Sequence, residues 1–301
     1  MISPASLDDA ARVAALFNAA FDDRLITVAG LRYRMASGRP EERTQYWRAE
    51  HKSELVGWAL GGLDAFAPVR TAGFAGIVVH PAYRREGIGS ALWDVVSAHL
   101  GEIGARRIVV HSRADDDSTA FARARGLRLD ATDTRSAVDP RKLPSPPAPP
   151  AGIELISMSA FVADPEPVFV ADYECFLDEP GPSDSSGMTY ETWRRHIWDH
   201  PDNDHELSAA VRVDGAIAGV TYLYADRATG RAANGGTGVI RDFRGRGLGL
   251  LLKQHSLTWA AVAGITRVIT QNDETNAPML AINARLGYEQ FSVGHAWVLE
   301  R

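Results

Sequence analysis

The 301-residue sequence predicts an α/β fold with a mixed sheet, built twice along the chain. Three observations lead to this prediction. Strand-like and helix-like runs follow one another in the same order in both halves. One glycine-rich motif recurs at the same place in that order, and a proline-rich segment separates the halves. Together these observations indicate two copies of one domain.

The proline-rich segment is DPRKLPSPPAPPAG, residues 139–152, and it holds six of the chain's 16 prolines. Proline lacks a backbone N–H and favours the extended polyproline II conformation. Such a segment can therefore build neither a helix nor a sheet ladder. We expect a linker over 139–152, an N-terminal domain over 1–138 and a C-terminal domain over 153–301.

The two halves repeat each other in detail. Arginine and glycines at 84, 87 and 89 recur at 244, 247 and 249, and GARRIVV at 104–110 recurs as GITRVIT at 264–270, all at one offset. Farther along, Gly126 aligns with Gly287 after a slip of one residue. An offset maintained over such a length indicates a duplicated domain.

The elements of the second half follow from local patterns. Asp214-Gly215 between two apolar runs is a hairpin signal, and the apolar spacing of 248–264 is helical and ends at Gly264. In order, we expect a strand at 153–157, helices at 166–177 and 189–198, strands at 206–213, 216–226 and 235–240, a helix at 248–264, a strand at 267–270, a helix at 277–287 and closing strands over 288–299. The first half follows the same order, with its hairpin at 46–62.

Composition narrows the class of protein. The chain is 45% hydrophobic and 23% charged with a net charge of −6, which argues against a nucleic-acid or anionic-membrane surface. The first residues form an amphipathic helical pattern without a basic n-region, and no apolar run is long enough to cross a membrane. Cys175 is the only cysteine, so neither an intrachain disulfide nor a paired-cysteine zinc site is possible. We expect a cytoplasmic protein without a metal.

The segment RDFRGRGLGLLLK, residues 241–253, places glycines between a strand and the start of a helix. The first N–H groups of a helix lack internal partners and carry partial positive charge, and glycine lets the backbone approach a ligand closely. A pyrophosphate suits such a site. A tight turn that binds nothing is the plain alternative. The dinucleotide and P-loop patterns fit poorly, because Thr270 ends the next strand and no Gly-Lys-Ser/Thr follows.

TGVIRDFRGRGLGLLLK resembles the acetyl-CoA-binding motif of the GNAT N-acetyltransferase superfamily, and GIVVHPAYRREGIGSALW resembles a second copy. NAPMLAINARLGYEQ is similar to the later family segment in which an asparagine opens a helix that closes in Leu-Gly-Tyr or Leu-Gly-Phe. The resemblance spans nearly all of both halves and implies two tandem GNAT domains. It also implies acetyl-CoA as the acyl donor and a primary amine of a small molecule as the acceptor.

The resemblance implies which residues bind acetyl-CoA. The strand before each loop would hold the pantetheine arm, the loop would hold the pyrophosphate, and the asparagine would contact the cofactor. In the second half these residues are Gly238, Val239, Ile240, Arg244, Gly245, Arg246, Gly247, Leu248, Gly249 and Asn276. In the first half they are Val78, Val79, His80, Arg84, Arg85, Gly87, Ile88, Gly89 and Ser90, with Asp115 or Asp116 as a poorer match to the asparagine.

The catalytic residues depart from the family pattern. Many members use a tyrosine seven residues after the asparagine as the acid, but that position is Asn283 here and about Ala122 in the first half. Asn283 is retained as a residue that could orient the thiol. For the general base Glu174 is the nominal choice, with Asp172 and Asp178 as neighbours in the same region. Asp226, His196 and His200 are further candidates in the second half. His200 and His205 could suggest a metal, but lack helix-spaced partners.

The second half has the cleaner motif, so we expect it to be catalytic, and the sequence leaves open whether the first half also binds acetyl-CoA. The acid-rich stretches 177–184 and 199–206 hint at a cationic amine. The missing tyrosine keeps a second hypothesis open, a non-catalytic acyl-CoA-binding or sensing protein. The sequence does not distinguish a monomer from a homodimer.

Overall fold

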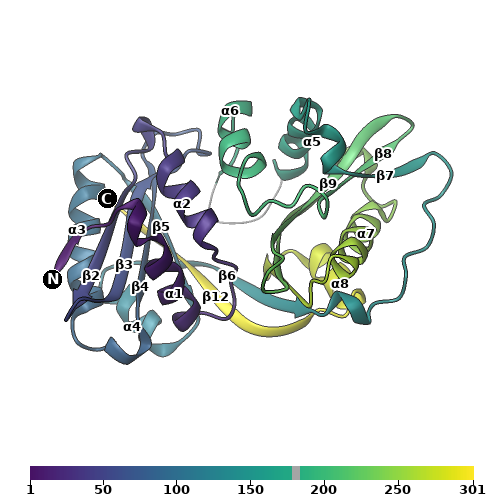
Figure 1. Cartoon of the computed structure of the whole chain (residues 1–301). Coiled ribbons are helices and arrows are strands. Elements are labelled where there is room, and N and C mark those ends of the chain that lie inside the picture. Colours follow the sequence, from purple (N-terminus) through teal and green to yellow (C-terminus); the bar gives the residue numbers. More distant parts are fainter. Residues whose placement is uncertain (178–183) are drawn as a thin grey trace. The chain divides into compact units, whose positions relative to one another are not determined.

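The computed structural model describes residues 1–177 and 184–301, which form two compact units (Figure 1). The N-terminal unit comprises Met1–Thr132, residues 184–187 and Val293–Arg301. The C-terminal unit comprises residues 133–177 and Met188–Ser292. No helix among the described residues is long and apolar enough to cross a membrane.

The N-terminal unit is a mixed sheet covered on both faces. Its elements are β1 (Ile2–Pro4), α1 (Ala10–Ala20), α2 (Val28–Ser37), β2 (Gln45–His51), β3 (Glu54–Leu63), β4 (Ala72–Val79), α3 (Ile88–Glu102), β5 (Arg107–Arg113), α4 (Asp116–Arg123) and the start of β6 (Arg128–Val138). The strand order is β1-β2-β3-β4-β5-β12, with only the β4–β5 pair parallel. Side chains of α1 pack with Trp58 and Val78, and side chains of α3 pack with Val56 and Ala59.

The C-terminal unit repeats this plan. Its elements are β7 (Ile153–Ser157), α5 (Glu166–Phe176), α6 (Tyr190–Trp193) with a π-helical turn (Arg194–Trp198), β8 (Ala209–Val213), β9 (Ala216–Asp226), β10 (Arg231–Val239), α7 (Leu248–Val262), β11 (Arg267–Asp273), α8 (Ala277–Arg285) and the start of β12 (Glu289–Glu300). The strand order is β6-β11-β10-β9-β8-β7, with only the β10–β11 pair parallel. The mixed α/β fold is confirmed.

Most predicted elements match the structure in type and place. Asp214 and Gly215 have φ values of 50° and 87°, as a two-residue hairpin turn with two left-handed positions requires. Two strands were predicted too short: β10 begins at Arg231 and β11 extends to Asp273. The missed part of β10, RAAN, begins with a charge and ends with an amide, so it lacks the apolar signal of a buried strand.

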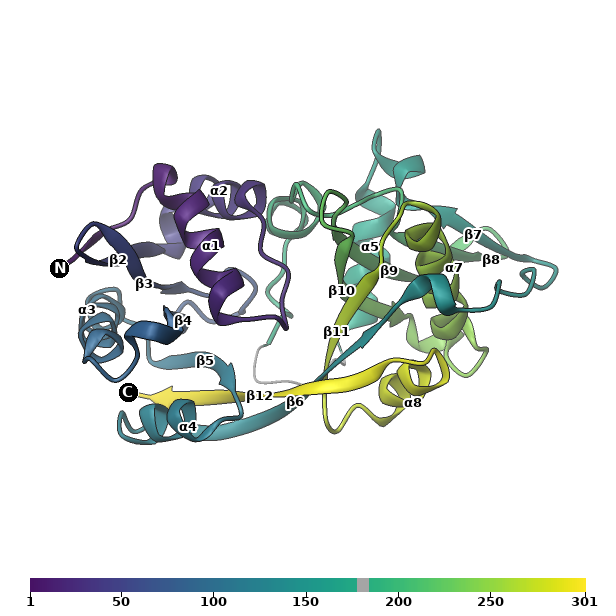
Figure 2. The ribbon, with the colours of Figure 1, turned by 60° about the horizontal axis from the view of Figure 1, so that its bottom comes forward.

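The last strand of each half begins in its own unit and ends in the other one. Residues 133–138 of β6 pair with Val268–Asp273 of β11 in the C-terminal unit, whereas Gly294–Glu300 of β12 pairs with β5 in the N-terminal unit (Figure 2). The compact units therefore differ from the sequence halves 1–138 and 153–301 at these two strand segments, and also at residues 184–187, which belong to the N-terminal unit. Period-2 patterning shows that a segment is a strand, but it does not say which edge the strand joins.

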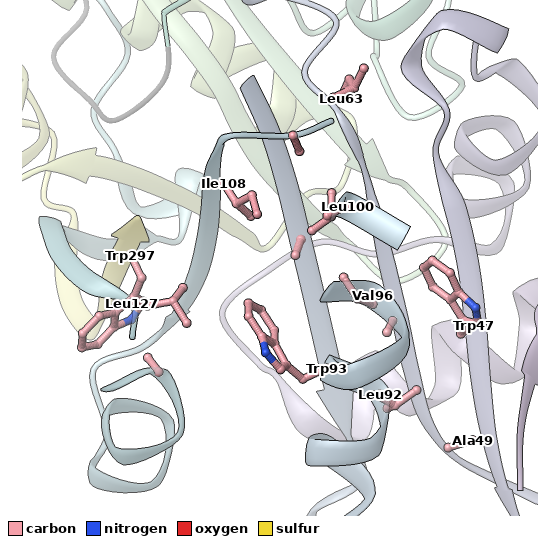
Figure 3. Packing of buried hydrophobic residues seen from close by; sticks show 14 of the residues in the cluster. Trp47, Ala49, Leu63, Leu92, Trp93, Val96, Leu100, Ile108, Leu127 and Trp297 are labelled. Atoms are coloured by element: carbon pink, nitrogen blue, oxygen red, sulfur yellow. The ribbon is translucent and has the colours of Figure 1, made fainter. Parts of the chain in front are cut away.

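The strand exchange has a testable consequence for stability. Trp297 is 1% exposed and belongs to the same buried cluster of the N-terminal core as Ile108 and Leu127 (Figure 3). Its Nε1 donates to Ser112 Oγ at 3.0 Å. We expect Trp297→Ala to lower the free energy of unfolding of the N-terminal unit by about 3–5 kcal/mol. Hydrogen exchange of the β5 amides measures this. Phe291→Ala, at an exposed position of the same strand, should change it by less than about 1 kcal/mol. Equal protection of the β5 amides from hydrogen exchange in both variants would contradict the packing of β12 in the N-terminal unit.

Candidate functional site

Strands β10 and β11 diverge within the C-terminal unit. They pair only from Arg231 to Ala233, after which β10 pairs with β9 alone, through a bulge between Asn234 and Gly236. The N-terminal unit repeats this divergence, since β4 pairs with β5 only over residues 72–75. A strand that has lost its neighbour presents backbone N–H and C=O groups along one edge, where an extended ligand can bind.

The predicted pantetheine residues lie along these diverging strands. Gly238 and Val239 end β10, Ile240 follows, and the Ile240 N–H donates to Ala218 O at 2.9 Å. In the N-terminal unit Val78 and Val79 end β4, and the His80 N–H donates to Val56 O at 2.8 Å. In both units the loop arginine reaches back to the strand. Arg244 Nε donates to Val239 O at 2.9 Å, and Arg84 Nε donates to Val79 O at 3.4 Å.

The glycine loop leads directly into helix α7. Gly247 caps the helix with φ +76°, Gly245 has the same φ, and a Cβ on either would meet no atom within 4 Å. Gly249 lies close to α8, because its Cβ would come within 3.3 Å of Ile282 Cδ1. The loop therefore leaves space in front of the first N–H groups of α7, which suits a pyrophosphate. Leu248 itself is buried and serves the core.

The N-terminal loop has the same backbone but different surroundings. Gly87 caps α3 with φ +82°, and Arg85 adopts φ +67° where the second unit has Gly245. The Arg85 guanidinium pairs with Asp117 at 3.2 Å, and Ser90 Oγ accepts from Arg125 Nη2 at 2.7 Å. Groups predicted to bind phosphate thus already have protein partners. Within the part of the chain that the structure describes, Arg246 of the second loop forms no ion pair and lies 5.9 Å from the Phe243 ring.

Helix α5 covers β10 at the divergence. A Cβ on Gly238 would lie 2.5 Å from Cys175 Cβ, and one on Gly236 would lie 2.9 Å from Phe176 Cζ. These glycines therefore allow α5 to approach the strand closely. Cys175 is buried, as its apolar helix predicts, and burial raises the pKa of its thiol to about 12. Its thiol is not a nucleophile at neutral pH.

Asp172 is the carboxylate of α5 that reaches the interior. The inward face of the helix consists of Val168, Ala171, Asp172 and Cys175, and Asp172 is 1% exposed. It interacts with Tyr222, which lies opposite Gly236 in the sheet register. Burial and this carboxylate raise the pKa of the Tyr222 hydroxyl well above its usual value.

Glu174, the nominal base from sequence, is exposed. Two residues along an α-helix correspond to about 200° of rotation, so Glu174 lies on the face opposite to Asp172. The placement therefore favours Asp172 over Glu174. Asp178, the other carboxylate considered, is in 178–183 and lies outside the described residues.

The acid-rich stretch 199–206 is largely paired within itself and with nearby arginines. Asp199 pairs with Arg194 at 3.1 Å, and Arg227 pairs with Asp204 at 2.6 Å and with Glu206 at 2.7 Å. Several acidic side chains of this stretch therefore already have cationic partners within the chain. The other stretch, 177–184, lies mostly outside the described residues.

The two histidines of this region have protein partners. His205 stacks on Trp198 with a ring-centroid distance of 4.1 Å, and its Nε2 lies 3.0 Å from Trp198 O. His200 is buried against Tyr224, and its Nδ1 accepts from the Asp202 N–H at 3.2 Å. Among the described residues, no three His, Cys, Asp or Glu side chains gather as metal ligands would.

Asn276 is the N-cap residue of α8, and Asn283 lies on this helix. Asn276 Oδ1 accepts from the Met279 N–H at 3.3 Å and caps the helix, as Asp115 caps α4 through the Ser118 N–H at 2.7 Å. Asn276 therefore has a structural role whether or not it contacts a ligand. Asn283 is buried, where its Oδ1 accepts from Lys253 Nζ at 2.7 Å and its Nδ2 donates to Asn272 Oδ1 at 2.6 Å.

Sequence reasoning missed Lys253. It is 1% exposed on the inward face of α7, and burial lowers the pKa of its amine to about 7. The available signal was a lysine in the middle of the apolar run LGLLLKQHSL. A long side chain on such a helix usually extends to solvent, which is why the pattern alone does not reveal a buried amine.

Known proteins are similar to this chain in sequence. The family model described as "Acetyltransferase (GNAT) family" matches residues 12–127 and 170–288. A "Mycothiol acetyltransferase" of Clavibacter sepedonicus is 30% identical over 227 residues, which are 73% of this chain and 70% of that protein. Another protein of that name, from Saccharomonospora viridis, is 28% identical over 251 residues, 79% of this chain and 77% of that protein.

Solved structures agree on the fold. A tandem GNAT protein from the clavulanic acid biosynthesis pathway has a TM-score of 0.76 and 23% identity, covering 100% of this chain and 98% of that one. A GCN5-related N-acetyltransferase from Sphaerobacter thermophilus has a TM-score of 0.74 and 20% identity, covering 100% and 95%. With the family model matched in both halves, the chain belongs to the GNAT acetyltransferase family and is an N-acetyltransferase with two tandem GNAT domains.

Proposed function

We propose that the protein transfers the acetyl group of acetyl-CoA to a primary amine of a small molecule, by direct attack in a ternary complex, and that the C-terminal unit performs the reaction. The observation that carries the proposal is a buried carboxylate, Asp172, beside the diverging strand of this unit. In the N-terminal unit the buried positions of the corresponding helix are Ala10, Val13, Ala14, Leu16 and Ala20, none of which can accept a proton.

The chain's own groups fit acetyl-CoA. The N–H groups at the start of α7, with Arg246 beside them, would hold the pyrophosphate, and the edge of β10 at Gly238 and Val239 would hold the pantetheine arm. When bound, acetyl-CoA supplies a thioester whose carbonyl carbon bonds to the amine nitrogen as its C–S bond breaks. Backbone N–H groups along β10 would stabilise the charge on the carbonyl oxygen.

Asp172 is suited to accept the proton that the attacking amine must lose. Its carboxylate is buried next to Tyr222, which pairs with Gly236 at the bulge of β10. In a poorly solvated site, a carboxylate attracts a cationic amine more strongly than it would in water. Proton transfer then leaves the neutral, nucleophilic amine. Asp172 would thus bind the acceptor and activate it.

Asp172→Asn should reduce kcat by about 100-fold to 10,000-fold with little change in KM for acetyl-CoA, because only the proton acceptor is lost. Glu174→Gln, two residues away on the exposed face, is the matched substitution and should retain most of the activity. Steady-state kinetics at fixed amine concentration compares the two. If Glu174→Gln is inactive and Asp172→Asn is active, the base is Glu174, as the sequence predicts.

Release of coenzyme A thiol from acetyl-CoA in the presence of a panel of amines tests the function itself. The acceptor of mycothiol acetyltransferase is the first amine to assay, because curated relatives at 25–30% identity carry that name. Amine-dependent release is the expected result. Tight binding of acetyl-CoA without release for any amine would instead favour the acyl-CoA-binding or sensing hypothesis.

A further inference from the structure

The C-terminal unit contains a buried amine that the reaction described above does not use. Lys253 Nζ donates to Asn283 Oδ1 at 2.7 Å and to Asn234 Oδ1 at 3.4 Å, and lies 4.8 Å from the centroid of the Tyr288 ring. In the described part of the chain no carboxylate pairs with it. Burying an amine without a counter-charge destabilises a fold, so packing alone does not explain this lysine.

The lysine lies where the two strands of the site separate. Asn234 follows Ala233, the last residue of β10 that pairs with β11, and directly precedes the bulge between Asn234 and Gly236. Asn272 lies on β11 beyond its pairing with β10, and it accepts from Asn283. Lys253 is therefore connected to both diverging strands, to β10 through Asn234 and to β11 through Asn283 and Asn272. The same divergence provides the strand edge for the pantetheine arm.

The N-terminal unit lacks this arrangement. The repeat aligns Lys253 with Trp93, Asn234 with Phe74 and Asn283 with Ala122. Trp93 and Ala122 belong to the apolar core of that unit. The duplication thus preserved the backbone in both copies, while among the described residues the positions aligned with Lys253 and Asn283 hold core side chains in the N-terminal copy.

The surroundings of Lys253 suit an amine that carries a proton when an anion is near. Its neighbours are the amide oxygens of Asn234 from β10 and Asn283 from α8, together with the ring of Tyr288, and all of them accept. Burial alone lowers the pKa of the amine to about 7, so near neutral pH a nearby negative charge decides its protonation. A thiolate formed beside it would favour the charged lysine, and the two charges would form together.

We propose that Lys253 is the buried cation of the acetyl-transfer site and stabilises negative charge on the sulfur of coenzyme A. This inference rests on the proposed function. When the C–S bond breaks, its electron pair remains on sulfur, and a positive charge at the point where the strands diverge lowers the free energy of that thiolate. Asn283 has no ionisable proton and cannot protonate the departing thiolate. Lys253 would instead stabilise the thiolate by its positive charge.

The experiment measures the ionisation of the thiol of coenzyme A bound to the full-length protein, from the ultraviolet absorbance of the thiolate, with desulfo-coenzyme A as the blank. In the wild-type protein, the pH of half-ionisation should be lower than that of free coenzyme A by about one pH unit or more. In Lys253→Met this shift should disappear. Lys142→Met, at an exposed lysine outside the site, should behave as the wild type.

A second variant separates charge from structure. Lys253→Gln keeps a donor for Asn283 but carries no charge, so the thiol shift should be absent there as well. If Lys253→Gln or Lys253→Met binds coenzyme A and keeps the full shift, the inference is wrong. If the wild type binds coenzyme A normally but does not lower the pH of half-ionisation of its thiol, this inference is wrong and the proposed function is unaffected. Failure of the wild type to bind coenzyme A would overturn the proposed function and this inference with it.

Discussion

Gly247→Asp is expected to weaken acetyl-CoA binding and turnover by about 100-fold or more, whereas Gly87→Asp should change turnover by no more than about twofold. At Gly247, φ is +76° and the space where a Cβ would lie is empty, so an aspartate fits at a strain of about 1–2 kcal/mol. Its carboxylate would then lie at the N-terminus of α7, where the pyrophosphate is proposed to bind. Two negative charges cannot share that site without strong repulsion.

Gly247→Asn is the matched control for charge. Asparagine has nearly the same shape and tolerates the left-handed conformation, so it carries the strain without the charge. We expect a loss of no more than about tenfold in this variant. Isothermal titration with acetyl-CoA and steady-state turnover measure both effects. Loss of activity in Gly87→Asp with retention in Gly247→Asp would assign the reaction to the N-terminal unit instead.

Lys253 is expected to make the stability of the C-terminal unit depend on pH between about pH 7 and pH 9. Its folded pKa of about 7 lies below the value of 10.5 that an exposed lysine has. Between the two values the unfolded chain binds a proton that the folded protein does not bind. The free energy of unfolding therefore rises with pH, by about 2 kcal/mol between about pH 7 and pH 9, and this stability is lost as the pH falls toward 7.

Lys253→Met should remove this dependence. Methionine has a similar volume and no titrating group, while the acceptor Asn283 Oδ1 loses its donor at a cost of about 1–3 kcal/mol that does not vary with pH. Urea unfolding at several pH values compares the slopes, and Lys142→Met serves as the control. Equal slopes in the wild type and in Lys253→Met would show that the buried amine does not have the lowered pKa.

Much of this protein follows from its sequence because the determining signals are local. The hairpin at Asp214-Gly215, the helix that ends before Gly264 and the glycine loop before α7 depend on backbone preferences of a few neighbouring residues. The repeat of Arg84 and Gly87 at Arg244 and Gly247 identified the duplication. The same motif identified the family, which the comparisons confirm.

Other features could be found only in the tertiary structure, because they depend on the direction in which a side chain points and on the distant residue that it contacts. Glu174 and Asp172 are both acids on one helix, and only the packing of α5 shows that Asp172 faces the strands. Asn283 marked a departure from the family pattern, but its contact with Lys253 joins residues thirty positions apart.

The sequence by itself determined the fold class, the duplication and the glycine loops, since each depends on short-range periodicity or on residues with special backbone freedom. The tertiary structure alone decided that β6 and β12 complete the opposite units, and that an amine and a carboxylate are buried in the C-terminal unit. Strand partners and burial arise from contacts between distant segments, and the pattern within a segment does not contain that information.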